Sequence, residues 1–506
     1  MKKIYNLMII AGTILFLLPA GCSLDKYPQD AIVTEQAFQT MADAAKQRNA
    51  LYSLLRARQY GLFTQTAEVM GDMFNATLDF GNRQGPMHIL TADMPDDYNV
   101  RDIWFNCYSA IAQVNNFISK IGNVVPEAAG DDVILANYAA EGHYVRAHLY
   151  YILIKYFGVD YEPGTAASKP GVPIVTEFNV NERPARATVK EVYDFILAEI
   201  TEAEKLTVAG VAKSERITID AVKALKSKIQ LLMHDFTGAA ATAGALISSG
   251  KYPLVTTVAD LKASWVNDNS TEDIFLMYAS NTEAGAVPAG SGSASTEQNQ
   301  SIYATYSTAS LRYVPDFLPT QTTVDLYVAG DLRRDVFLSD PATDIVRSAS
   351  VGGDFPGVFF LKKYPGNPAL FSSANTNYRH KPKVARIAEQ YLIAAEALNS
   401  SGGLTYLNAL RTARGLSTLG AWSDAELQNE WAREMIGEGV RIECLKRWNL
   451  GFNGRLPQDA GCVIGPTDAN YAQKSCPAGY YRFTLPVPVN ELRTNPNMAQ
   501  TPEWLN

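Results

Sequence analysis

Apolar residues recur at helical spacing through much of the chain. The segment 188–206 places them on one stripe and opens with a capping box formed by Thr188 and Glu191. The segment 141–158 is apolar nearly all round and stops at Gly158, which is typical of a buried helix with a glycine C-cap. The pattern predicts a mainly α-helical protein.

Two stretches nearer the C-terminus extend this pattern. Residues 389–416 indicate two helices separated by a break at 400–403, and the segment 423–448 begins with a second capping box, Ser423 and Glu426. Neighbouring helices are joined by short turns and carry alanines where they would touch. This layout predicts tetratricopeptide-like helix pairs stacked into a solenoid, although no regular 34-residue period is present.

The helical pattern is interrupted between residues 261 and 382. Gly, Ser, Pro and Asn become frequent there, and the stretch 285–301 is nearly of low complexity. The Tyr and Phe residues in the same region argue against simple disorder. We therefore expect an ordered, loop-rich region carried by the helical scaffold.

The N-terminus has the features of an export signal. Two lysines precede an apolar run over residues 7–18, which is too short to span a bilayer. Ala20, Gly21 and Cys22 resemble the bacterial lipobox, in which the cysteine thiol is acylated, although Pro19 stands where that pattern prefers Leu. We predict a lipidated Cys22; the alternative is ordinary secretion without a role for this thiol.

These patterns divide the chain into six expected segments. They are a lipoprotein signal peptide over 1–21, the lipidated cysteine and a tether over 22–44, the first part of the helical scaffold over 45–260, the loop-rich ligand-binding region over 261–382, the second part of the scaffold over 383–455, and a C-terminal wrapping segment over 456–506.

Composition narrows the function classes. The 506 residues carry a net charge of −8 without a dense Lys or Arg run, which disfavours nucleic acid as a partner. Among the five cysteines, Cys462 and Cys476 bracket a loop rich in turn formers. For an exported chain, a disulfide there would contribute about 3 kcal/mol. Two unpaired thiols are the alternative.

Catalytic motifs are absent from the sequence. It contains no His-Glu-x-x-His, no Gly-x-Ser-x-Gly and no phosphate-binding Gly-x-x-x-x-Gly-Lys-(Ser/Thr). His143 and His148 are five residues apart on a helix and so point away from one another. Nothing singles out two carboxylates as a glycosidase pair. We expect a binding protein rather than an enzyme, with no cofactor and no metal.

Several motifs, in order along the chain, resemble the SusD/RagB family of nutrient-binding outer-membrane lipoproteins of Bacteroidetes. The resemblance rests on the lipobox-like cysteine with "LDKYP", on "VRAHLYYILIKYFG" with "GVPIV", on "YLIAAEALN" with "YLNALRTARG", on "EWAREMIGEGVRIECLKRWN", and on "YRFTLPVPVNELRTNPNM". One departure is the insertion "FGVDYEPG", since Asp-Val-Pro usually follows Phe-Gly directly in this family. Another is Trp431 with Arg433, where the family often has Glu-Arg.

The resemblance implies a fold and a role. It implies a solenoid of about four tetratricopeptide-like pairs with a loop-rich half that bears a shallow ligand site. It also implies a surface-exposed lipoprotein that caps a SusC-like (RagA-like) TonB-dependent transporter and delivers glycans or, in the RagB branch, oligopeptides. In the motif 438–447, the spacings Glu438–Arg441 and Glu443–Arg447 fit helical ion pairs with a structural role, each contributing about 0.2–0.5 kcal/mol if exposed.

Two loop stretches combine aromatic and polar side chains in the way that a sugar site requires, with rings for the apolar face of the sugar and polar groups for its hydroxyls. The candidates are Asp79, Asn82, Arg83, Asp96, Tyr98 and Asn99 in the first stretch, and Tyr303, Tyr306 and Tyr313 in the second. The alternative is that these rings pack the loops onto the solenoid. Asp96 with Asp97 could instead bind a peptide N-terminus, so an oligopeptide ligand is the second reading, and a purely structural surface subunit is the third.

Overall fold

The computed structural model describes residues 37–179, 181–280, 302–307, 309–371, 379–465 and 470–505. Cys22 and the predicted signal peptide lie outside these residues. The folded body begins earlier than the predicted tether end at residue 44, because Phe38 is buried and Thr40 and Asp43 form a capping box at the first described helix. In the described part of the chain, no helix has the length and apolar character needed to cross a bilayer.

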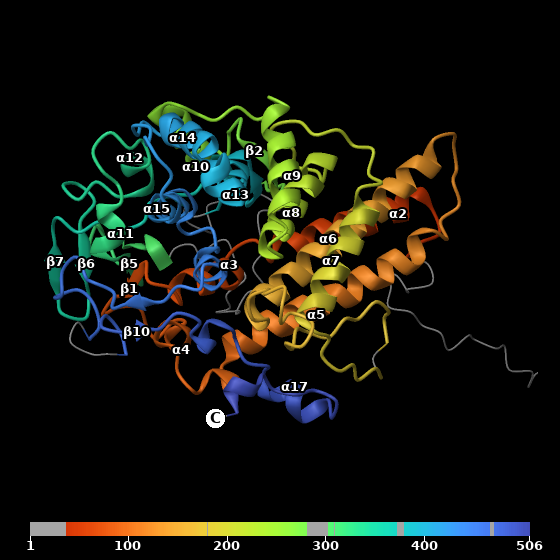
Figure 1. Cartoon of the computed structure of the whole chain (residues 1–506), viewed down its shortest axis with the longest axis horizontal. Helices are drawn as coiled ribbons and strands as arrows, with labels where there is room; N and C mark the ends of the chain where they lie inside the picture. The colour runs from red at the N-terminus through yellow and green to blue at the C-terminus, as the bar shows by residue number, and fades with distance from the viewer. Residues whose placement is uncertain are drawn as a thin grey trace, which may run out of the picture.

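Long helices form one half of the molecule (Figure 1). They are α2 (Met41–Arg56), α5 (Tyr98–Ile121), α6 (Asp131–Phe157), α7 (Val189–Ala203), α8 (Ile219–Leu232) and α9 (Phe236–Ser248). Helix α6 packs against α2, α5 and α7, and α8 packs against α7 and α9. The C-terminal half of α6 is buried all round, as its apolar sequence predicts.

Local sequence signals set the ends of these helices. The Thr188 side chain accepts a hydrogen bond from the backbone N–H of Glu191, whose carboxylate accepts one in return, so the predicted capping box at α7 is confirmed. Helix α6 ends at Phe157 with Gly158 as its C-cap, also as predicted. Gly158 is extended there rather than left-handed.

A second group of helices continues the scaffold. It contains α13 (Ile387–Leu398), η4 (Asn399–Ser401), α14 (Gly403–Ala413), α15 (Asp424–Met435) and α16 (Arg441–Arg447). Helix α13 packs against α9, α14 and α15, through a buried cluster rich in alanine. The paired helices give the mainly α, tetratricopeptide-like fold that the sequence predicts.

The predicted capping box at α15 is only half formed. Ser423 accepts a hydrogen bond from the backbone N–H of Glu426. The Glu426 carboxylate instead accepts a hydrogen bond from Arg411 on α14 at 3.0 Å. A contact between two helices has therefore taken the place of the second half of the box.

Short helices and strands make up the other half of the molecule. They are α3 (Leu62–Val69), β1 (Phe74–Ala76), α4 (Gly85–Ile89), η1 (Met94–Asp96), α10 (Val258–Val266), β2 (Asp273–Leu276), β3 (Tyr306–Ser307), β4 (Arg312–Tyr313), β5 (Phe317–Pro319), α11 (Gln321–Asp325), α12 (Arg334–Phe337), β6 (Val346–Ser348), β7 (Gly353–Phe355), η3 (Pro368–Leu370) and β8 (Lys383–Arg386). The C-terminal segment adds β9 (Phe452–Asn453), β10 (Ser475–Cys476), η5 (Tyr481–Phe483), α17 (Val489–Thr494) and η6 (Pro502–Trp504).

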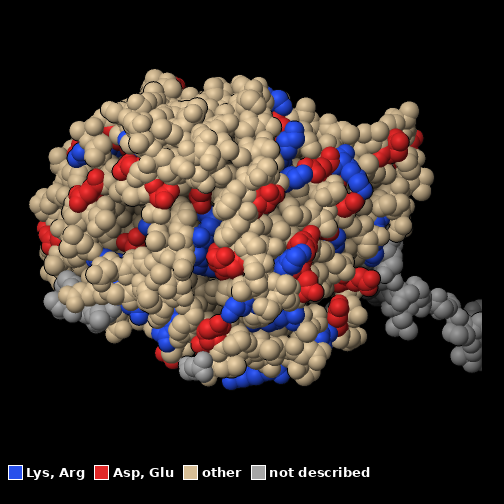
Figure 2. All heavy atoms as spheres, in the orientation of Figure 1, with Lys and Arg blue, Asp and Glu red and all other residues tan. Residues whose placement is uncertain are grey.

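Small sheets hold this half together. Strands β3, β4, β6 and β7 form one sheet in that order, and β1 pairs antiparallel with β5 so that Phe74 lies opposite Pro319. A separate hydrophobic cluster, which includes Phe74, Phe317 and Phe337, fills the space between these strands and α3, α10 and α15. Acidic and basic side chains are interspersed over the face shown in Figure 2, as on an ordinary solvated surface.

A buried ion-pair network joins the loop-rich half to the second group of scaffold helices. The carboxylate of Glu434 on α15 accepts hydrogen bonds from Arg333, Arg386 and Arg414 at 3.1, 3.0 and 2.9 Å. Glu272, before β2, also pairs with Arg386 and Arg414. The three arginines come from parts of the sequence that are far apart, so the network fixes these parts relative to one another.

The ion pairs predicted within the motif 438–447 are wrong. Glu438 lies in the turn before α16, where it pairs with Lys363 and Arg386, and Arg441 pairs with Asp72 at 2.7 Å. Helix α16 is also mostly buried rather than exposed, so its charged side chains reach other elements. Accordingly, Glu443 accepts a hydrogen bond from Tyr151 on α6, and Arg447 pairs with Glu396 on α13. The structural role expected for this motif holds, with different partners.

The turn before α16 also depends on a buried carboxylate and on glycine. Glu68 on α3 accepts hydrogen bonds from the backbone N–H groups of Gly437, Gly439 and Val440 at 3.1, 2.8 and 3.0 Å. Gly439 has a φ of +80°, and a Cβ there would lie 2.7 Å from the Cα of Thr64. Only glycine fits this position without displacing the backbone.

The predicted disulfide between Cys462 and Cys476 is not formed: both are free thiols. Cys462 donates a hydrogen bond to the carbonyl of Asp459 and packs in a small cluster under β5 and β6. Cys476 lies on β10 and packs in the main core. Burial raises the pKa of both thiols, that of Cys462 to about 12. Sequence spacing could not foresee that the two side chains would enter different clusters.

We predict that Gly439→Ala lowers the free energy of unfolding by about 3 kcal/mol or more, because it adds a clash with Thr64 to the cost of the left-handed backbone. Gly250→Ala is the matched control, since Gly250 has a φ of +66° with nothing within 4 Å of its Cβ position. It should cost only about 1 kcal/mol. Urea unfolding monitored by circular dichroism measures both, and equal losses would contradict the role assigned to the Thr64 contact.

Candidate functional site

The loop between β1 and α4 contacts the four-stranded sheet. Asp79 in this loop accepts hydrogen bonds from the backbone N–H and the hydroxyl of Ser350 at 2.9 and 2.7 Å. Burial alone would raise the pKa of Asp79, but the hydrogen bonds from Ser350 and Ser348 hold it below its ordinary value. Because Ser350 lies in the turn between β6 and β7, this contact fixes the loop against the sheet.

A second contact links the same loop to β5. The guanidinium of Arg83 pairs with the carboxylate of Asp316 at 2.7 Å. Asp316 is buried, whereas half of the Arg83 side chain is exposed. Burial raises the pKa of Asp316 to about 7, with Arg83 opposing this rise and Asp79 adding to it. Asn82, next to Arg83, is exposed and has a left-handed backbone with a φ of 56°.

Two tyrosines form an aromatic pair on the sheet. Tyr306 on β3 and Tyr313 on β4 lie opposite each other, with ring centroids 5.0 Å apart in an edge-to-face arrangement. Tyr313 also packs on Phe360 at 4.4 Å, which supports the pair from below. Tyr306 is 40% exposed. Tyr306 is therefore held against Tyr313 and remains partly exposed to solvent.

Charged side chains lie on the strands beside this pair. Arg312 on β4 and Arg347 on β6 both pair with Asp354 on β7, at 2.9 and 2.7 Å. All three side chains are partly exposed. Because side chains alternate between the two faces of a strand, these charged side chains and the Tyr306–Tyr313 pair lie on opposite faces of the sheet. We call the part of the sheet that carries the Tyr306–Tyr313 pair the tyrosine sheet surface.

Not all predicted site residues reach a surface. Tyr303 is fully buried and packs on Phe74 at 5.0 Å, so it is a core residue, as the packing alternative proposed. Asn99 is also buried, on the first turn of α5. Asp96 and Tyr98 are exposed near the start of α5, but they make no hydrogen bond or ring contact with the tyrosine sheet surface among the described residues. The nine predicted residues therefore do not form one site.

Sequence reasoning missed several residues of this region. Asp316, Arg347, Ser350 and Asp354 come from short strands and turns that carry no periodic signal. Strand pairing, which is not visible in the sequence, brings them to the predicted residues. The sequence signal that did locate the region is its local enrichment in tyrosine.

A separate groove lies along α5 and α17. It has a volume of about 500 Å³, and its lining includes Phe105, Tyr108, Arg183 and Glu491. Phe105 is 62% exposed. Burial raises the pKa of Glu491, although a hydrogen bond with Trp104 opposes this rise. The groove is an alternative ligand surface.

A cavity between the two halves has a volume of about 70 Å³. Ligand pockets usually measure about 300–1,000 Å³, so this cavity is too small for an oligosaccharide. His148 lines it, and burial together with Lys228 and Lys155 lowers the pKa of its imidazole to about 3. The imidazole is thus neutral at physiological pH and is not suited to general acid–base catalysis there.

Two protein-family models match this chain. A family model described as "Starch-binding associating with outer membrane" matches residues 24–231, and a model described as "SusD family" matches residues 346–504. The two matches cover both groups of scaffold helices, apart from α9 and the last residue of α8. The chain belongs to the SusD/RagB family. The resemblance stated from the sequence motifs is thereby confirmed.

Relatives of this SusD/RagB chain with curated names match it over part of its length. SusD-like protein P38 of Formosa agariphila is 26% identical over 287 residues, which are 53% of this chain and 50% of that protein. The starch-binding protein SusD of Bacteroides thetaiotaomicron is 32% identical over 123 residues, which are 23% of this chain and 20% of that protein. The chain thus spans at most about half the length of these relatives.

Solved structures of the superfamily match nearly the whole chain. A SusD superfamily protein from Bacteroides thetaiotaomicron has a TM-score of 0.76 and 22% identity, with 92% of this chain and 100% of that chain covered. A laminarin-binding SusD-like protein has a TM-score of 0.69 and 21% identity, with the same coverage. At these identities the comparison establishes the fold of the SusD/RagB chain.

The pKa of Asp316 leads to a pH-dependent prediction. The folded protein keeps the Asp316 carboxyl protonated up to about pH 7, whereas the unfolded chain releases this proton near pH 4. The contribution of Asp316 to the free energy of unfolding therefore decreases as the pH rises from about 4 to about 7. We predict that the difference in free energy of unfolding between wild type and Asp316→Asn falls by about 2 kcal/mol from pH 5 to pH 7.

Urea unfolding at pH 5, 6 and 7 measures this difference. Asp354→Asn is the control, because Arg347 and Arg312 lower the pKa of that exposed carboxyl, so that it stays ionised over the whole window. Its difference from wild type should stay constant. Parallel pH profiles for wild type and Asp316→Asn would contradict the assignment.

Proposed function

We propose that this SusD/RagB protein is a surface-exposed outer-membrane lipoprotein that captures nutrient oligosaccharides and delivers them to a SusC-like TonB-dependent transporter. The observation that carries the proposal is the tyrosine sheet surface. A sugar ring stacks its apolar face on an aromatic ring, while its hydroxyls need donors and acceptors close by. The Tyr306–Tyr313 pair supplies the rings, and each tyrosine hydroxyl can donate and accept a hydrogen bond.

Relatives support the choice of a carbohydrate. One structure of the same fold is described as laminarin-binding, another as surface glycan-binding protein A from Bacteroides fluxus, and a curated relative as starch-binding. Binding at an open surface is weak in comparison with binding in an enclosed pocket, which suits a protein that must release its ligand to a transporter.

The attachment to the membrane would be covalent. Acylation of Cys22 adds about 0.8 kcal/mol for each buried CH₂ group, so more than one acyl chain gives stable anchoring. Residues between Cys22 and the buried Phe38 would then be the tether to the folded body. This places the protein at the outer membrane beside its SusC-like transporter. We propose no catalytic step for it.

The oligopeptide alternative rests on weaker support in the structure. Asp96 and Asp97 were the candidates for binding a peptide N-terminus. The Oδ1 atom of Asp97 already accepts the backbone N–H of Asn99 at 2.7 Å as the N-cap of α5, so part of this carboxylate holds the start of the helix. An oligosaccharide is therefore the favoured ligand class.

The prediction is that Tyr306→Ala and Tyr313→Ala each weaken oligosaccharide binding by about tenfold, as expected for the loss of one stacked ring. Isothermal titration calorimetry of the full chain against α- and β-linked glucose oligosaccharides and against a set of oligopeptides measures this. Tyr306→Phe should keep most of the affinity, because the ring is retained.

Phe105→Ala is the matched control for an exposed aromatic on a different surface, and it should bind as wild type does. Loss of oligosaccharide binding in Phe105→Ala but not in Tyr306→Ala would move the site to the groove along α5. If the protein bound oligopeptides but no oligosaccharide, the ligand class proposed here would be wrong. If it bound neither class, the proposed function would be wrong.

A further inference from the structure

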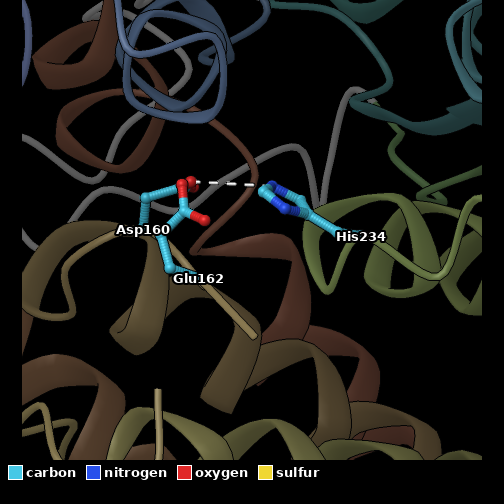
Figure 3. Close-up of side chains that lie close together, drawn as sticks. All are labelled: Asp160, Glu162 and His234. Atoms are coloured by element: carbon cyan, nitrogen blue, oxygen red, sulfur yellow. Dashed lines mark ion pairs between the residues drawn. The ribbon is translucent and has the colours of Figure 1, made fainter. Parts of the chain in front are cut away.

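The loop after α6 carries two carboxylates that the proposed function does not use. Asp160 and Glu162 lie in the segment 158–164, which departs from the family pattern in the sequence. The structure places both beside His234, in the turn between α8 and α9 (Figure 3). One ligand atom from each of the three side chains lies within 4.8 Å of the other two.

The spacing of Asp160 and His234 suits a bridging ion better than a hydrogen bond between them. The Oδ2 atom of Asp160 and the Nε2 atom of His234 are 3.7 Å apart, as the dashed line in Figure 3 marks. A hydrogen bond between them would need about 2.7–3.2 Å. Two ligand atoms on a tetrahedral zinc ion, each at about 2.0–2.1 Å, lie about 3.4 Å apart. A shift of a few tenths of an ångström would bring the Asp160 and His234 atoms to this separation.

Both atoms are also buried and without a hydrogen-bond partner among the described residues. Buried polar atoms are nearly always satisfied by a protein group, by water or by an ion. Figure 3 shows the Asp160 carboxylate directed towards the imidazole, with the Glu162 side chain beside it. Glu162 is exposed, so this side of the group is open to solvent.

The two sides of the group are held in place independently. The His234 ring stacks on Phe236, with centroids 5.5 Å apart and an interplanar angle of 12°. On the other side, Tyr161 packs edge-to-face on Tyr193 of α7 at 5.3 Å. Lys446 donates a hydrogen bond to the carbonyl of Gly158 at 2.6 Å, which fixes the start of the loop. The His234 ring and the backbone of the loop after α6 are therefore held in place.

Two cationic side chains lie near Asp160, and both have other partners. The ammonium of Lys446 donates to the carbonyls of Lys155 and Gly158, and Arg447 pairs with Glu396 at 2.7 Å. In the described part of the chain, Asp160 forms its ion pair with His234 rather than with either of these side chains. Two carboxylates and an imidazole thus remain for a cation.

We propose that Asp160, Glu162 and His234 bind a divalent transition-metal ion, for which zinc is the best match. Imidazole and carboxylate ligands suit zinc, whereas calcium takes six to eight oxygen ligands and magnesium keeps most of its waters. Three protein ligands leave one coordination position for water. The ion would connect the loop after α6 to the turn between α8 and α9, and so link successive helix pairs of the scaffold.

The test uses the full chain without a polyhistidine tag, titrated with zinc chloride alone by isothermal titration calorimetry. Wild type should bind one equivalent, and His234→Asn should weaken this binding by about tenfold or more. Asparagine suits the replacement because His234 has a left-handed backbone with a φ of 59°, which asparagine tolerates. Asp160→Asn should have the same effect.

Asp194→Asn is the matched control, because it removes an equivalent charge from an exposed carboxylate on α7. It should bind zinc as wild type does. Circular dichroism and urea unfolding in the presence of EDTA establish that each variant is folded. Absence of zinc binding in wild type, binding that persists unchanged in both His234→Asn and Asp160→Asn, or a preference for calcium over zinc would each overturn the proposal.

Discussion

Glu434 is the group on which the arrangement of the two halves depends. Its buried carboxylate meets guanidinium groups from the loop after α11, from β8 and from the end of α14. Burial alone would raise the pKa of Glu434, but Arg414, Arg386 and Arg333 hold it well below its ordinary value. An ion network of this kind need not add net stability over an apolar core. It does penalise any arrangement in which one charge loses its partners, and so it selects a single packing.

This constraint explains the structural role of the motifs that identify the family. Glu438 and Arg441 in the turn before α16 join Lys363 and Asp72, and Glu68 accepts the backbone N–H groups of the same turn. These side chains are used in joining one half of the molecule to the other. The aromatic side chains of the candidate site lie instead on short strands without a motif.

The parts of the fold that the sequence predicted are those with local causes. Thr188 and Glu191 are three residues apart, Gly158 follows an apolar run directly, and the break at 400–403 interrupts a helical stripe, so each is visible in a short window. The candidate site depends on long-range pairing. No local pattern could place Ser350 on Asp79, because 271 residues separate them.

The wrong predictions have the same origin. The Cys462–Cys476 disulfide was inferred from spacing alone, but the two thiols enter different clusters. Tyr303 and Tyr306 are neighbours in a tyrosine-rich stretch, yet one is buried against Phe74 and the other lies on the sheet. The residue types in the sequence pointed to this tyrosine-rich region. Only the strand pairing showed that Tyr306 lies on the sheet surface and Tyr303 in the core.

Hydrogen–deuterium exchange of the full chain, with and without saturating oligosaccharide, tests the central claim most directly. The claim is that the loop-rich half binds the ligand at the tyrosine sheet surface while the scaffold stays unchanged. Slower exchange should be confined to peptides covering residues 302–316 and 344–356, with α6 and α7 unaffected. Slower exchange along α5 and α17 instead, without a change in the sheet, would contradict this account.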